Sequence, residues 1–157
     1  MVLGPQFHDS FGAEPIKSKA ISIINKRAAS DKPVITGDEA RTVFRAANVR
    51  QWTSMEDQPT IYESGVGMYD GWREPDEVLH TAQKHLHTPT LQKYMRGEVP
   101  EYDPDYADDS GVSEVEYYPE VMTTRRGTPF IGEGHHRFVA SRLQDRGTNT
   151  WESRTNE

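Results

Sequence analysis

Apolar residues recur at helical spacing in two segments of the N-terminal third. From Ile16 to Ala28 they fall three or four positions apart, as on the buried face of an α-helix. Thr36-Gly-Asp-Glu39 has the Ser/Thr-x-x-Glu form of a capping box, and the apolar positions after it repeat at i, i+3, i+4 and i+7. The pattern predicts one helix over 16–28 and another after Thr36. The residues predicted to face inward are Ile16, Ala20, Ile23, Ile24 and Ala28 in the first helix and Ala40, Val43, Phe44 and Ala47 in the second.

This periodicity is lost from Gln51 to Gly71, where proline, glycine, serine and acidic residues interrupt the sequence. Such a composition indicates a long loop, with one short strand near Thr60–Glu63. Aromatic residues spaced through the loop carry enough apolar surface to anchor it on the core. The predicted anchors are Trp52, Tyr62, Tyr69 and Trp72.

Two helical pieces are predicted between residues 75 and 97. Pro75-Asp-Glu77 is typical of a helix opening, because proline fits the first turn and carboxylates favour the positive end of the helix dipole. Pro89 is expected to break or bend this helix, and a second piece is expected to end at Gly97. The predicted inner faces are Val78, Leu79, Ala82 and Leu86, followed by Leu91, Tyr94 and Met95.

Strand-like segments follow the acidic middle of the chain. Val115–Met122 is typical of a strand, in which Pro119 would suit an edge or a bulge. Arg126-Gly127 would turn this strand back into residues 128–131 as a hairpin. The hairpin therefore delivers Phe130 and Ile131 to the glycine-rich stretch that comes next.

A strand, a tight turn and a helix are predicted there in succession. The apolar run enters a Gly-x-Gly turn at Gly132–Gly134, and a helical pattern leaves it from about His136 to Arg146, with Gly147 as the expected C-cap. A last short strand is expected over Thr148–Trp151. The elements together predict an α+β fold, a small mixed sheet with flanking helices.

Length and composition favour one domain with a modest core, since the chain has 157 residues of which 34% are hydrophobic. We expect an irregular segment over 1–15, a single domain over 16–151 that contains an acidic loop at 98–112, and a polar tail over 152–157. The chain has no cysteine, which excludes thiol catalysis and thiolate metal sites. No membrane-spanning stretch or signal-peptide pattern is evident, so a cytoplasmic protein is expected.

The charge of the chain is unevenly distributed. The net charge of −7 argues against a surface that coats nucleic acid. Residues 1–52 nevertheless carry eight Lys or Arg against five Asp or Glu, and residues 97–124 carry nine acidic residues and no basic one. Positive charge returns around the glycine turn, and most of it is expected to be solvated. The arginines concerned are Arg125, Arg126, Arg137, Arg142 and Arg146.

The turn has the chemistry of an anion site. A helix N-terminus presents unpaired backbone N–H groups and a positive dipole end, and His135, His136 and Arg137 add side-chain donors at the same place. Phosphate is the anion that such a turn typically holds. The alternative is structural, in which Gly134 only permits a positive φ, the histidines are exposed or cap the helix, and Arg137 pairs with an acid of residues 97–124.

The hairpin, Glu133-Gly-His-His-Arg137 and the helix after it resemble the ParB/sulfiredoxin-like family over residues 113–151. In members such as free-serine kinases and many phage and plasmid ParB-like proteins, the turn has the sequence Asp-Gly-His-His-Arg. In sulfiredoxins a reactive cysteine stands where this chain has His135, which excludes sulfinic-acid reduction. In the chromosome-partitioning members, which bind CTP, only Gly134 and Arg137 match.

The resemblance implies binding of a nucleoside triphosphate (ATP or CTP) or of a nucleic-acid phosphate, with NTP hydrolysis, phosphoryl transfer or nuclease activity as the chemistry. Gly134, His136 and Arg137 would then bind phosphate, the arginine bidentately. Glu133, His135 and His136 are the candidate catalytic residues, with Glu133 or His135 as base, and a carboxylate there could recruit Mg²⁺. The size, the acidic cysteine-free composition and this motif would suit a DNA-binding or nucleotide-binding protein of a bacteriophage or mobile element.

Three other groups of residues are candidates for binding a metal ion or a partner protein. His80, His85 and His87 lie within one predicted helix but do not share a face, so no metal site is predicted there. Residues 103–114 have acids at three positions of a calcium loop but lack its glycine, which indicates a solvated loop. The acids and tyrosines of residues 98–120 could instead imitate a nucleic-acid backbone and bind a host protein, which would make the chain a non-enzymatic interaction factor.

Overall fold

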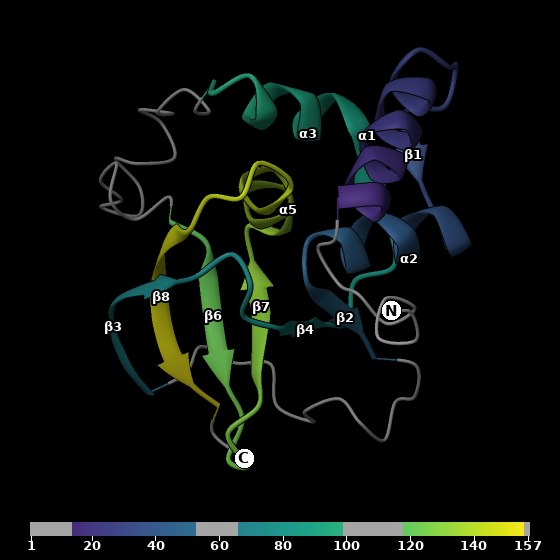
Figure 1. Cartoon of the computed structure of the whole chain (residues 1–157). Helices are drawn as coiled ribbons and strands as arrows, with labels where there is room; N and C mark the ends of the chain where they lie inside the picture. Colours follow the sequence, from purple (N-terminus) through teal and green to yellow (C-terminus); the bar gives the residue numbers. More distant parts are fainter. Residues whose placement is uncertain (1–13, 53–65, 99–117, 156–157) are drawn as a thin grey trace, which may run out of the picture.

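The protein has a mixed α/β fold, seen in a computed structural model that describes residues 14–52, 66–98 and 118–155 (Figure 1). The predicted α+β class is confirmed. The helices of these residues are α1 (Glu14–Ala28), α2 (Gly37–Ala46), α3 (Thr88–Met95) and α5 (His135–Leu143). The strands are β1 (Val34–Ile35), β2 (Val49–Gln51), β3 (Val66–Arg73), β4 (Leu79–Thr81), β5 (Leu86–His87), β6 (Glu120–Thr123), β7 (Pro129–Glu133) and β8 (Thr148–Arg154).

The central sheet has six strands in the order β2-β4-β7-β6-β8-β3. The pairs β2–β4, β4–β7 and β6–β8 are parallel, whereas β6–β7 and β3–β8 are antiparallel. A separate two-stranded sheet joins β1 to β5. In Figure 1 the helices gather above the row of strands, with β7 running directly into α5.

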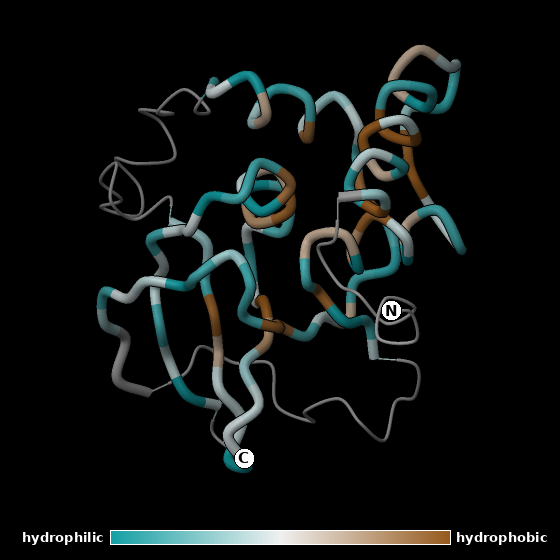
Figure 2. The backbone as a smooth tube through the Cα atoms, viewed as in Figure 1, coloured by the Kyte–Doolittle hydropathy of each residue, from teal (hydrophilic) through white to brown (hydrophobic). Residues whose placement is uncertain are grey.

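The main core lies between the helices and one face of this sheet. Val121 of β6 and Ile131 of β7 contribute to it, together with Phe44 of α2 and Phe138 of α5. Their neighbours along the strands, Met122 and Phe130, point to the other face because side chains alternate, and there they pack with Trp52 in a smaller cluster. In Figure 2 hydrophobic stretches mark α1, α5 and β6, the elements that meet in the main core. No helix in the described residues is long and apolar enough to cross a membrane.

Both N-terminal helices are confirmed, with one difference in how the second begins. Ala40, Val43, Phe44 and Ala47 are all buried, as their spacing predicted. Thr36 is the N-cap of α2 but its side chain makes no capping hydrogen bond. The start of α2 is therefore not stabilised by the predicted capping box. Glu39 instead accepts a 2.8 Å hydrogen bond from Arg27, which connects α2 to α1.

The helix predicted to open at Pro75 is wrong. Residues 75–77 form a turn, and β4 and β5 follow as short strands. Leu79 and Leu86 are buried as predicted, but Val78 is exposed. The competing interactions are tertiary: β4 pairs with β2, and the carbonyls of Glu74 and Glu77 bind a side chain of α5 instead of accepting from a helical N–H.

The second predicted helix is confirmed as α3, which ends before Gly97, a residue with φ of +81°. Pro89 lies in its first turn and so begins this helix instead of breaking one. Trp52 is buried, whereas Tyr69 and Trp72 are 58% and 53% exposed on β3 and do not anchor the core. The expectations for Tyr62, the strand Thr60–Glu63, and the acidic and calcium-like segments after Glu98 lie outside the described residues.

The C-terminal elements follow the prediction with different ends. The β6–β7 hairpin is confirmed, with Gly127 in its turn at φ of +91°. Pro119 directly precedes β6, which is an interior strand and not an edge. Of the two predicted alternatives the bulge is the one observed, since the register shifts between Glu120 and Val121. Asp145, at φ of +56°, takes the left-handed position after α5 that Gly147 was expected to occupy. The last strand runs on to Arg154, so residues 152–154 belong to the sheet.

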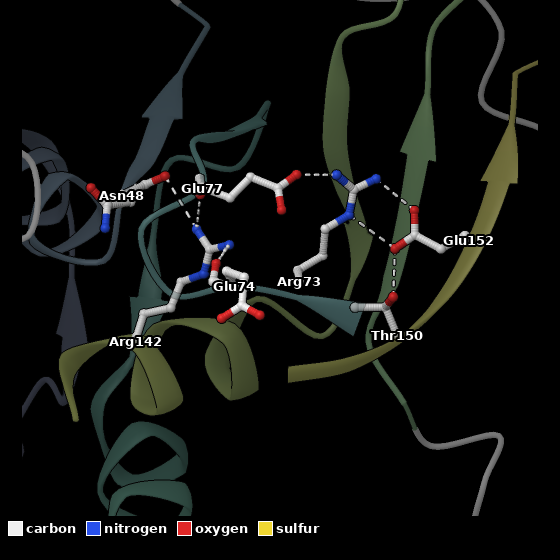
Figure 3. A network of polar contacts seen from close by, with 7 residues as sticks. All are labelled: Asn48, Arg73, Glu74, Glu77, Arg142, Thr150 and Glu152. Atoms are coloured by element: carbon white, nitrogen blue, oxygen red, sulfur yellow. Dashed lines mark hydrogen bonds and ion pairs between the residues drawn. The ribbon is translucent and has the colours of Figure 1, made fainter. Parts of the chain in front are cut away.

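Arg142 was expected to be solvated, but only 1% of it is exposed. Its guanidinium donates to the backbone carbonyls of Glu77 at 2.6 Å and Glu74 at 2.9 Å, and more weakly to those of Ala47 and Asn48 (Figure 3). Burial lowers the pKa of Arg142 to about 10, so the group stays cationic at neutral pH. One side chain of α5 therefore holds the two loops that lead into β2 and β4.

A second arginine extends this network across the sheet. Arg73 donates to both carboxylate oxygens of Glu152, at 2.6 and 3.0 Å, and also to the carboxylate of Glu77 (Figure 3). Thr150 donates to Glu152 as well. Glu77 thus joins the two arginines, through its carbonyl to Arg142 and through its carboxylate to Arg73.

We predict that Arg142→Met lowers the free energy of unfolding by about 3 kcal/mol or more, because four backbone carbonyls, two of them in buried contacts, lose a charged donor. Urea denaturation followed by circular dichroism measures the loss. Arg146→Met is the matched control, since Arg146 is exposed at the end of the same helix. Equal stability of the two variants would contradict the structural role of Arg142.

Candidate functional site

The turn between β7 and α5 depends on a glycine. Gly134 is the N-cap of α5 and has φ of +87° and ψ of +28°, the left-handed region that favours glycine. A Cβ atom here would lie 2.6 Å from Cβ and 2.7 Å from Cα of Pro119. Gly134 is therefore required twice, by the backbone conformation and by the close approach of the segment that precedes β6.

A β-bulge lies one residue before it. Val121 pairs with Ile131, but Glu120 pairs with Glu133, so Gly132 is the extra residue on β7. A Cβ on Gly132 would lie 3.1 Å from a carboxylate oxygen of Glu120. The bulge thus brings two glutamates into register on neighbouring strands beside the turn.

Glu120, Gly132 and Glu133 are part of the lining of a cleft of about 560 Å³. The buried side chains of Trp52, Met122 and Phe130 form its apolar floor. Polar residues of β4 and the loop after it, of β6 and β7, and of the start of α5 form the rest of the lining. They are Thr81, Gln83, Glu120, Glu133 and His135, with Ala82, Ile131 and Gly132 between them.

His135, one of the lining residues of the cleft, is buried and uncharged. It is 8% exposed, and its Nε2 lies 2.6 Å from the hydroxyl of Thr81. That hydroxyl oxygen also accepts from the backbone N–H of Gln83. In the tautomer that carries its proton on Nδ1, the His135 ring accepts the hydroxyl proton of Thr81 at Nε2. Burial, followed by the proximity of His136 and His85, lowers the pKa of His135 to about 3. His135 thus fixes α5 to β4.

His136 points to the other side of the turn. Its Nε2 accepts a 2.9 Å hydrogen bond from the backbone N–H of His87, where β5 leads into α3. Burial, followed by the proximity of His87 and His85, lowers the pKa of His136 to about 4. His136 is therefore neutral at pH 7, and the proton that it can still donate is on Nδ1.

Arg137 also lies away from the cleft. Its guanidinium carbon is 5.8 Å from the centre of the Tyr118 ring, within range of a cation–π contact. Neither Arg137 nor His136 is among the residues that line the cleft. The five predicted site residues are thus brought together at one turn, but Glu133 and His135 face the cleft whereas His136 and Arg137 do not.

The structure adds a carboxylate that the sequence interpretation missed. Glu120 is half-buried, and burial first and the neighbouring Glu133 second raise its pKa above the ordinary value. Counting from the hairpin turn would have placed Glu120 opposite Gly132. Only the bulge at Gly132 shifts Glu133 into that position. Thr81, Gln83 and Trp52 were missed because they belong to segments predicted as helix or loop.

The prediction that His80, His85 and His87 lie within one helix is wrong. His80 is in β4, His85 is in the loop after it, and His87 precedes α3 as its N-cap. Across residues 14–52, 66–98 and 118–155, no three histidine, aspartate or glutamate side chains are placed to hold a metal ion.

Comparison of the chain with protein-family models, curated proteins and solved structures finds no match. The likeness to the ParB/sulfiredoxin-like family therefore rests on the Glu133–Arg137 motif and on the strand, turn and helix in which it lies.

We predict that Gly134→Ala destabilises the protein by about 2 kcal/mol or more, because a left-handed alanine is strained and its methyl group meets Pro119. Gly127→Ala is the matched control. Gly127 has a similar φ of +91° but nothing within 4 Å of an added Cβ, so it should lose only the conformational part, about 1 kcal/mol. Thermal and urea unfolding measure both, and the prediction fails if Gly127→Ala costs as much as Gly134→Ala.

We also predict that stability falls as the pH is lowered below 6.5. The pKa of His135 is about 3 in the folded protein, so between these values the unfolded chain binds a proton that the folded protein does not. Acid therefore favours unfolding, by up to about 1.4 kcal/mol per pH unit for this one residue. Urea titrations at several pH values measure the slope, which His135→Gln should reduce. An NMR titration in which the His135 ring titrates near pH 6.5 would overturn the assignment.

Proposed function

We propose that the protein binds a phosphate group of a nucleoside triphosphate or a nucleic acid at the turn Gly134–Arg137. The observation that carries the proposal is the start of α5. The helix begins directly after a strand at a left-handed glycine, its first turn contains no acidic residue, and Arg137 lies within that turn.

The backbone supplies the donors. Phe138 is the first residue of α5 whose N–H bonds back within the helix, to the carbonyl of Gly134 at 3.1 Å. The N–H groups of His135 and His136 precede it in the first turn, where a helix offers no acceptor of its own. Together with the helix dipole they favour a negatively charged group at this end.

Side chains complete the proposed site in revised roles. Arg137, oriented against Tyr118, would bind phosphate oxygens through its planar fork. His136 would donate from Nδ1, because its Nε2 is occupied by the N–H of His87. Its neutral state means that the positive charge at the turn comes from Arg137 and the helix dipole.

The proposed chemistry is NTP hydrolysis, phosphoryl transfer or phosphodiester cleavage, with Glu133 as the base. Glu133 is exposed at the end of β7, directly before the turn. His135 is the less suitable base, since it is buried and its Nε2 is bonded to Thr81. We therefore assign His135 the role of positioning α5.

Mg²⁺ would have to be supplied with the nucleotide. Oxygen ligands such as Glu120 and Glu133 suit this ion, which is usually bound by one or two carboxylates together with substrate phosphates. In the parts of the chain that the structure describes, no third acidic or histidine side chain joins them as a ligand. The residues present do not form a dedicated metal site, and no step of the proposal depends on one.

Calorimetric titration with ATP, CTP, GTP and a short DNA, with and without Mg²⁺, tests the proposal. We expect at least one of these to bind, and Arg137→Ala to weaken it about tenfold or more, since a hydrogen bond to a charged group contributes about 1.5–3 kcal/mol. Arg126→Ala, at the exposed β6–β7 turn, is the control and should bind as the wild type does.

Two outcomes would count against the proposal. Equal binding by Arg137→Ala and the wild type would place the ligand elsewhere. Failure of every ligand to bind would favour the interaction-factor alternative, in which activity depends on the acidic residues of 98–120.

A further inference from the structure

We infer that the cleft beside the turn binds a small organic cation, an ammonium or guanidinium group carried on an apolar stem. This site goes beyond the proposed phosphate site and does not depend on it, because the cleft lining includes neither Arg137 nor His136. Its occupant follows from the shape, the floor and the charge of the cleft.

The floor is suited to an apolar body. The rings of Trp52 and Phe130 lie 5.3 Å apart between centres, and Met122 packs beside them. The ring of His80 stacks on Trp52 at 5.8 Å and supports it from β4. A cleft of about 560 Å³ is within the range of natural small-molecule sites, which combine an apolar lining with a few placed polar groups.

The charge of the cleft determines whether it favours a cationic or an anionic ligand. Among the described residues of the lining, Glu120 and Glu133 are acidic and none is lysine or arginine. His135 adds no positive charge, since its pKa is about 3. Within the lining an anion would meet two carboxylates and no cationic side chain, whereas a cation would lie between them. The nearby ammonium group of Lys84 is outside the lining and donates to the backbone carbonyl of Trp52.

The apolar floor distinguishes an organic cation from a metal ion. Mg²⁺ retains several waters and prefers an octahedral set of oxygen ligands, which an aromatic floor does not offer. An alkylammonium or guanidinium ion can bury its stem on Trp52 and Phe130 and keep its charged end at the carboxylates. The bulge at Gly132 makes this possible, because it brings Glu133 into register with Glu120 above that floor.

The test uses three probes that share one stem and differ in charge: phenethylammonium, 2-phenylethanol and 3-phenylpropionate. Each is titrated into the full chain and followed by ¹H–¹⁵N NMR. We expect the ammonium to bind most tightly, the alcohol more weakly and the carboxylate not at all, with shifts at the amides of Thr81, Gln83 and Gly132. Equal affinity for the three probes, or shifts confined to other regions, would overturn the inference.

Single substitutions then locate the charge. Glu120→Gln and Glu133→Gln keep the shape of the lining, and each should weaken phenethylammonium about tenfold or more. Asp31→Asn, an exposed change in the loop after α1, should leave it unchanged. Arg137→Ala should also bind the amine normally, which separates this site from the phosphate site. Unchanged binding in both Gln variants, or complete displacement of the probe by equimolar Mg²⁺, would refute an organic-cation site.

Discussion

The buried guanidinium of Arg142 is the interaction on which the rest of this structure depends. Removing such a group from water is unfavourable unless hydrogen bonds compensate. Here the compensation comes from carbonyls of two separate loops, at Ala47 and Asn48 and at Glu74 and Glu77. The same contact therefore fixes α5, which starts at the turn around Gly134, against the strands next to it. The carboxylate of Glu77 also accepts a hydrogen bond from Arg73. Arg73 in turn donates to Glu152 of β8, toward the other edge of the sheet (Figure 3).

This rigid frame gives one turn two electrostatic faces. The helix end and Arg137 provide positive potential on the α3 side, whereas Glu120 and Glu133 provide negative potential on the cleft side. The two faces lie within a few residues of each other along the chain. Their separation depends on two glycines, one in the strand and one in the turn. Gly132 allows the bulge that brings the carboxylates together, and Gly134 allows the sharp change of direction into α5. The two proposed ligands, of opposite charge, would thus lie near each other and would share only the carboxylate of Glu133.

The parts of the fold that sequence could predict are those built from local contacts. The periodicity of Ile16–Ala28 and of Ala40–Ala47, and the strand, turn and helix around Gly134, all use residues close in sequence, so their patterns survive in the structure. Residues 75–87 have an equally good helical pattern and nevertheless form strands, because their partners are β2 and Arg142. Local propensity is a weak guide when distant partners decide the conformation.

The candidate site divides in the same way. The motif Glu133–Arg137 could be found from the sequence, but its division into two faces could not, since this depends on Thr81 and His87 as partners of the two histidines. Glu120 was hidden for a different reason. A bulge changes the pairing register by one residue. Pro119 indicated an edge or a bulge in this region, but the sequence did not show that Gly132 of β7 is the extra residue.

The distance in sequence between Arg142 and its acceptors has a consequence for biogenesis. Helices α1 and α2 can form from neighbouring residues as synthesis proceeds, whereas the carbonyls of Ala47 and Asn48 wait for a donor 95 and 94 residues downstream. Contacts of such long range are closed late, because the entropy of ordering the intervening chain must be overcome first. The turn at Gly134, where we propose that a phosphate binds, is therefore fixed in place only after the C-terminal helix has been made, and a nascent or truncated chain that lacks Arg142 lacks this contact.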